Sequence, residues 1–199
     1  MNRRRLRAAL LAAALTATLA GCGIRSTEVP TDFGPGPSRV PCVMSGSSIA
    51  SQSSGIPVQV FLVCAAQLVT VDRTVRIPAD KATTDRVRIA QALLDELEHP
   101  PSDPEKQAGF ATDVRGGTVV SGPGDDDPDD ALRFSTPPES LSAFALAQIV
   151  CTYADSAAAA GERSVILGGP GDAPLRRYEC TQAVRQRPGT EAPPAETVK

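Results

Sequence analysis

The stretch LSAFALAQIVCTY, residues 141–153, is apolar on nearly every face of the helix that its spacing predicts. A helix that is apolar all round is buried in a core. Directly before it, Thr136-Pro137-Pro138-Glu139 combines a capping box with a proline at the first helical position, which predicts where the helix begins. We therefore expect the fold to assemble around this buried helix.

Short strands are predicted on both sides of this helix. Residues 58–63 form the apolar run VQVFLV, whose β-branched side chains are typical of an inner strand. In residues 69–77 apolar and polar side chains alternate with a period of two, and Arg73 interrupts the apolar face. Ala65-Ala66, between the two runs, is expected to turn the chain. Further strands are predicted at 117–121, 131–135, 164–167 and 175–181.

A second helix is predicted between residues 84 and 99. Thr83 or Thr84 is the expected cap, and His99 precedes two prolines that end the helix. Val87, Ala90, Leu94 and Leu97 lie at helical spacing and form an apolar stripe. The predicted order is ββ-α-ββ-α-ββ, an α+β fold in which two helices pack on a small sheet.

The first 21 residues have the features of an export signal. Four arginines among residues 2–7 precede an apolar run of 13 residues, Ala8–Ala20, which is too short to span a bilayer core of about 30 Å. The run ends in Leu19-Ala20-Gly21-Cys22, which resembles the lipobox of bacterial lipoproteins. That resemblance implies cleavage between Gly21 and Cys22 and a diacylglycerol on the Cys22 sulfur. We expect a lipid anchor on the extracytoplasmic face of the cell membrane.

Composition and charge divide the rest of the chain. Residues 22–56 are rich in Pro, Gly and Ser and are expected to form a flexible tether, and residues 183–199 a disordered tail. The folded domain is expected at 57–182. Without the four leader arginines, 16 basic residues face 23 acidic ones. An acidic chain is poorly suited to hold phosphate backbones, so nucleic acid is excluded as a partner.

Export also decides the expected cysteine chemistry. Apart from Cys22, the chain contains Cys42, Cys64, Cys151 and Cys180, an even number for an oxidising compartment. Their spacing matches no zinc pattern, so two disulfides are expected. Three pairings are possible. The favoured one is Cys64–Cys151 with Cys42–Cys180, and its nearest rival is Cys42–Cys64 with Cys151–Cys180.

Three features were considered as catalytic or ligand-binding candidates. His99, the only histidine, stands at a predicted helix end, where an imidazolium complements the helix dipole. The acidic loop 125–130 is interpreted as a solvated hairpin loop, and a calcium site there stays open. The glycine-rich segment 168–172 lacks the Lys-Ser/Thr of a phosphate-binding loop and is interpreted as a turn. No catalytic residue, metal ligand or cofactor is predicted.

Three stretches of the chain resemble the sporulation and spore-germination domain known as GerMN. They are Val58–Val75, which ends in RTV; Ala92–Thr112, in which a Leu-Leu pair precedes a segment of prolines and acids and then GFAT; and Leu132–Tyr153, which contains AQIVCT. Together they span most of residues 57–181. The resemblance implies a domain that binds or assembles at the cell envelope without a recognised catalytic set, often on lipoproteins.

These observations lead to one expected function and two alternatives. The expected protein is a membrane-anchored, non-catalytic lipoprotein whose GerMN-like domain contacts an envelope protein or the peptidoglycan. The first alternative is an enzyme that acts on the cell wall. The second is an accessory subunit of a membrane complex.

Overall fold

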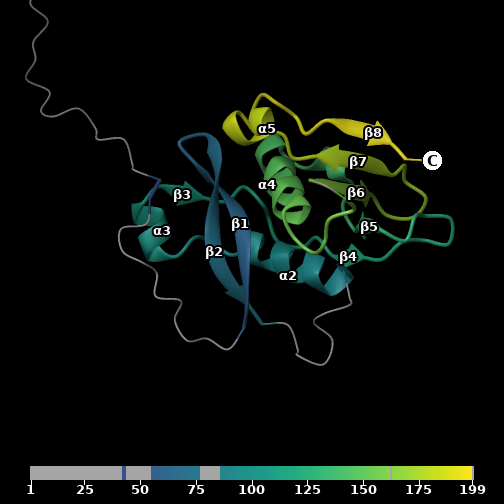
Figure 1. The fold of residues 1–199 in the computed structure, drawn as a ribbon, viewed down its shortest axis with the longest axis horizontal. Coiled ribbons are helices and arrows are strands. Elements are labelled where there is room, and N and C mark those ends of the chain that lie inside the picture. Colours follow the sequence, from purple (N-terminus) through teal and green to yellow (C-terminus); the bar gives the residue numbers. More distant parts are fainter. Residues whose placement is uncertain (1–41, 44–54, 77–85, 162, 199) are drawn as a thin grey trace, which may run out of the picture. The chain divides into compact units, whose positions relative to one another are not determined.

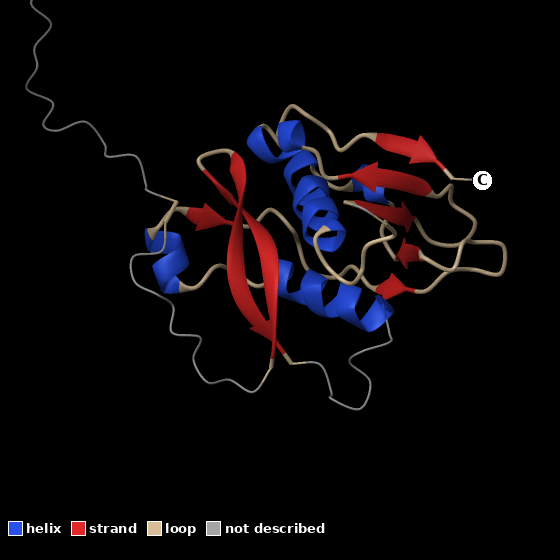
Figure 2. Cartoon of the chain, viewed as in Figure 1, coloured by secondary structure: helices blue, strands red, loops and turns tan. Residues whose placement is uncertain are grey.

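The computed structural model describes residues 42–43, 55–76, 86–161 and 163–198. The first 41 residues are outside this part of the chain, so the predicted leader, Gly21 and Cys22 are not among the residues whose structure is described. Thr83 and Thr84, the expected helix caps, also lie outside it. Figure 1 labels the elements of the described region, and Figure 2 shows their helices and strands.

The first sheet has the order β2-β1-β3. Its strands β1 (Ile56–Cys64) and β2 (Gln67–Val75) pair antiparallel along their whole length. The turn between them is made by Ala65 and Ala66, as predicted, and both have positive φ, 49° and 62°. A two-residue turn in which both residues have positive φ matches the twist of the two strands in a tight hairpin. On the other edge, β3 (Phe110–Ala111) pairs with the end of β1.

The second sheet has five strands in the order β4-β5-β6-β7-β8. They are β4 (Val120–Ser121), β5 (Ala131–Phe134), β6 (Ser164–Gly168), β7 (Arg176–Glu179) and β8 (Ala195–Thr197). Only the β5–β6 pair is parallel. A parallel pair needs a crossover connection, and the buried helix supplies it. The mixed α+β class is confirmed, with two sheets where the sequence predicts one.

The helix α4 (Ala143–Ala154) contacts both sheets, through β1 on one side and through β6 and β7 on the other. In Figure 1 it lies, in green, between the hairpin and the C-terminal strands. Its residues from Ala147 to Ala154 are all buried, as its composition predicts. The Tyr153 hydroxyl donates to the carbonyl oxygen of Ala90 at 2.7 Å, and its ring packs edge-on against Phe134.

The predicted beginning of this helix is wrong. Residues 138–140 form a separate 3-10 turn, η2 (Pro138–Ser140), and the N-cap of α4 is Ser142. The Ser142 hydroxyl accepts a hydrogen bond from the backbone N–H of Ala145 at 3.1 Å. The proline and capping signals at Thr136 therefore begin a turn that leads into the helix.

The second main helix, α2 (Arg86–Glu98), buries Ala90, Leu93, Leu94 and Leu97. This confirms the predicted stripe, which packs against β1 and α4. The short helix α3 (Asp103–Gln107) follows it. Within α3, Glu105 forms a buried ion pair with Arg73, Nη2 to Oε2, at 3.0 Å. That partner explains how an arginine is accommodated on the drier face of β2.

Two polar side chains of α4 form hydrogen bonds with the backbone of β1, as a neighbouring strand would. Gln148 donates to the carbonyl oxygen of Phe61 at 2.9 Å, and Thr152 accepts from its N–H at 3.0 Å. Both side chains are fully buried, so each backbone group of Phe61 has a partner away from water. These contacts hold β1 at a defined register against α4.

The expected disorder of residues 183–199 is corrected by the structure over most of that segment. Residues 182–186 form the helix α5 (Gln182–Gln186), in which Val184 is buried, and β8 pairs with β7. The proline-rich and glutamate-rich composition of this segment therefore belongs to a final edge strand and the loop before it. No helix among the described residues is long and apolar enough to cross a membrane.

Candidate functional site

The cysteine pairing differs from the favoured prediction. The structure joins Cys42 to Cys64 and Cys151 to Cys180, with Cα–Cα distances of 5.8 and 4.8 Å. The favoured pairing is therefore wrong and its nearest rival is correct, while the predicted number of two disulfides is confirmed. Disulfides persist in oxidising compartments, so this pattern indicates an extracytoplasmic domain.

The arrangement of α4 explains why Cys64 does not reach Cys151. Helix α4 contacts β1 at Phe61, and Cys64 lies three residues further along the strand, about 10 Å away. That separation exceeds the reach of a disulfide. Cys42 instead lies near Cys64, because both contact the carbonyl oxygen of Ala108. The Cys42 N–H donates to that oxygen, and the Cys64 Sγ lies 3.6 Å from it.

The Cys151–Cys180 disulfide lines an open pocket of about 40 Å³. Its other lining residues come from separate parts of the chain: Phe61 in β1, Ala154 and Asp155 at the end of α4, Arg163 before β6, and Arg185 in α5. A pocket of this size holds a few water molecules or one small chemical group. It lies where β1, α4 and the C-terminal segment meet.

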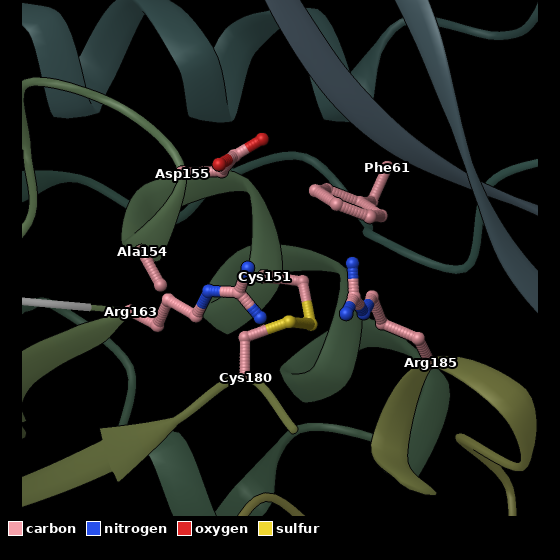
Figure 3. Close-up of a pocket in the computed structure, with 7 residues that line it drawn as sticks. All are labelled: Phe61, Cys151, Ala154, Asp155, Arg163, Cys180 and Arg185. Carbon is pink, nitrogen blue, oxygen red and sulfur yellow. A yellow bond between two sulfur atoms is a disulfide. The ribbon is translucent and has the colours of Figure 1, made fainter. Parts of the chain in front are cut away.

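Two arginines dominate the chemistry of this pocket. Figure 3 shows the guanidinium groups of Arg163 and Arg185 on either side of the disulfide, both directed into the pocket. The Asp155 carboxylate points away from them. Among the described residues, neither guanidinium group forms an ion pair or a side-chain hydrogen bond. Two cationic groups without an acidic partner therefore face the same space.

Local structure positions the backbone at both arginines, of which Arg163 is exposed and Arg185 is half-buried. Arg163 has a positive φ of 55° and directly precedes β6, whose five residues are all buried. Arg185 follows the buried Val184 in α5, and that helix is capped by the Thr181 hydroxyl, which accepts from Val184 at 3.2 Å. The ring of Phe61, only 3% exposed, adds an apolar wall.

The arrangement is suited to binding an anion. A guanidinium group stays protonated at all physiological pH values and offers several N–H donors in a planar fork. It therefore binds carboxylate or phosphate oxygens and does not exchange protons as an acid or base. The pocket supplies charge and hydrogen bonds for recognition.

The structure describes the surroundings of His99 and of the acidic loop. His99 follows the last residue of α2, as predicted, and is exposed. In the acidic loop, Asp127 turns toward Arg133 and accepts from its Nη2 at 2.7 Å. Arg133 also donates to the carbonyl oxygens of Gly169 and Ala173, both at 3.0 Å. Within the described ranges, no group of three or more His, Cys, Asp or Glu residues is placed to hold a metal ion.

The sequence reasoning missed the arginine pocket. Arg163 and Arg185 are two of 20 basic residues, and neither lies in a recognisable motif. The only signal nearby is the Cys151–Cys180 pair, which the sequence placed among the rival pairings. With that pairing known, Arg185 lies near the disulfide in sequence, whereas Arg163 reaches it because the Cys180 N–H donates to the Arg163 carbonyl oxygen at 3.1 Å.

The chain was compared with protein-family models, with curated proteins and with solved structures, and none of the three comparisons gives a match. The resemblance to GerMN domains therefore stays a prediction.

Proposed function

We propose that this protein is a lipoprotein, anchored through Cys22, whose folded domain is a non-catalytic binding module on the extracytoplasmic side of the cell membrane. The basic leader and the lipobox-like Leu19–Cys22 support the anchor. The two disulfides support the compartment.

The observation that carries the binding role is the pair of arginines directed into one pocket. A desolvated guanidinium group binds an anion strongly, and an exposed one still provides a positive charge that attracts it. The resemblance to GerMN domains adds the expectation of a partner in the envelope. That partner is an envelope protein or the peptidoglycan.

Replacement of Cys22 tests the anchor. Cys22→Ala removes the sulfur that would bear the lipid, so we expect the protein to leave washed membranes. Gly23→Ala, which leaves Cys22 in place, is the matched control and should remain bound. Retention of the Cys22→Ala chain in membranes after an alkaline wash would contradict the anchor.

Crosslinking in living cells, followed by purification of the tagged chain, tests the binding role. Recovery of one dominant envelope protein, or of peptidoglycan fragments, is the expected result. Stoichiometric recovery of a whole membrane complex would identify the chain as an accessory subunit. Shortening of purified peptidoglycan by the purified chain would instead favour the cell-wall enzyme, and the non-catalytic proposal would be wrong.

A further inference from the structure

We infer that the pocket between Arg163 and Arg185 binds a carboxylate group of an acidic peptide. This inference rests on the proposed binding role and names the chemical class of the ligand. Both guanidinium groups point into the pocket from opposite sides of the Cys151–Cys180 disulfide, as Figure 3 shows. A carboxylate placed between them can accept hydrogen bonds from both, in the bidentate geometry that arginine favours.

The charges around the pocket favour a singly charged ligand. Asp155 lines the pocket at the C-terminal end of α4, where the helix dipole adds a partial negative charge. With Asp155, the two arginines leave a net charge of +1 in the lining, which a single carboxylate neutralises. A phosphate dianion would leave an excess of negative charge in the pocket.

The size and the lining of the pocket agree with this choice. A volume of about 40 Å³ admits a carboxylate and the carbon that bears it, while a larger ligand would extend into solvent. The buried ring of Phe61 provides an apolar wall for the methylene or methyl group next to the carboxylate. A peptide side chain or a peptide C-terminus has this combination of groups.

The test is a titration of the isotope-labelled full chain with the C-terminal amide of N-acetyl-alanyl-glutamate, which carries one carboxylate, followed by NMR. We expect shifts for the resonances of Phe61, Cys151, Arg163 and Arg185, and no such shifts with the neutral N-acetyl-alanyl-glutamine amide. Arg163→Gln and Arg185→Gln should each weaken binding about tenfold, the loss of one charge-assisted contact. Arg176→Gln, an exposed arginine outside the pocket, is the control and should bind like the wild type.

Three results would overturn the inference. They are equal shifts with the acidic and the neutral peptide, unchanged binding by both pocket variants, and binding of inorganic phosphate at lower concentrations than the acidic peptide. The spectra outside the pocket show whether each variant is folded. Should both pocket variants still recover the envelope partner in cells, the proposed function stands and this inference fails.

Discussion

At the scale of single residues, the arginines of this domain divide by whether a carboxylate lies within reach. Arg73 is paired with Glu105, and Arg133 is paired with Asp127, whose side chain is only 9% exposed. Each of these pairs ties a strand to a neighbouring segment. Arg163 and Arg185 have no such partner among the described residues and line the same pocket, which makes them the candidates for an external anion.

The first prediction concerns the pH dependence that Asp127 adds to stability. The hydrogen bond from Arg133 holds the pKa of the Asp127 carboxyl below its ordinary value. A lowered folded-state pKa stabilises the protein above the unfolded pKa of about 3.9, and this contribution is lost as the pH falls through the folded-state value. We expect Asp127→Asn to be less stable than the wild type at pH 7 and to approach it as the pH falls through the folded-state pKa of Asp127. Urea unfolding at several pH values measures this.

Asp125→Asn is the matched control, because Asp125 lies in the same acidic loop and is exposed. Its stability should differ little from that of the wild type at every pH. If both variants lost the same amount of stability at pH 7, the charge of the loop would account for the effect and the ion pair with Arg133 would not.

At the scale of elements, α4 positions the rest of the domain. It connects the parallel strands β5 and β6, contacts β1 through Phe61, and carries one half of the disulfide in the pocket. Its apolar composition predicts burial, and burial is observed at Ala145 and from Ala147 to Ala154. The helix begins after Ser142, whose hydroxyl caps it. The sequence pattern predicts that cap at Thr136, six residues too early.

The second prediction separates the observed cap from the expected one. Ser142→Ala removes the hydroxyl that accepts from Ala145 and that also donates to Asp113, so it should destabilise the domain by about 1 kcal/mol or somewhat more. Thr136→Ala should cost less, because Thr136 does not cap α4. Chemical denaturation followed by circular dichroism compares the two, and a larger loss for Thr136→Ala would contradict the structure.

At the scale of the whole molecule, two short covalent loops brace the domain. The disulfides join cysteines separated by 22 and 29 positions in the sequence. Cys42–Cys64 attaches the chain N-terminal to β1 to the end of that strand. Cys151–Cys180 joins the helix α4 to the segment after β7 and so keeps the two arginines of the pocket close.

The third prediction concerns these crosslinks. Peptide mapping without reduction should recover Cys42 with Cys64 and Cys151 with Cys180. Removal of the second disulfide by Cys151→Ala with Cys180→Ala should lower the free energy of unfolding by about 3 to 4 kcal/mol, the value expected for a loop of this length. Recovery of Cys64 linked to Cys151 would contradict the fold around α4.

Features that depend on local sequence were predictable, and features that depend on contacts between distant residues were not. The sequence alone predicts the strands of the hairpin, the stripe of α2 and the burial of α4, because each depends on local periodicity. It predicts two disulfides from the even cysteine count and from the export signal. It does not predict the pocket, since Phe61, Arg163 and Arg185 are far apart in the chain and share no pattern.

The sequence by itself determined the α+β class, its two main helices and the number of disulfides among Cys42, Cys64, Cys151 and Cys180. Only the tertiary structure decided which cysteines pair, that α5 packs against β2 and α4 while β8 pairs with β7, and that two arginines line one pocket. The physical reason is that periodicity records which face of an element is buried, while distant side chains meet only once the elements have packed. Here the packing of α4 between the two sheets sets those distances.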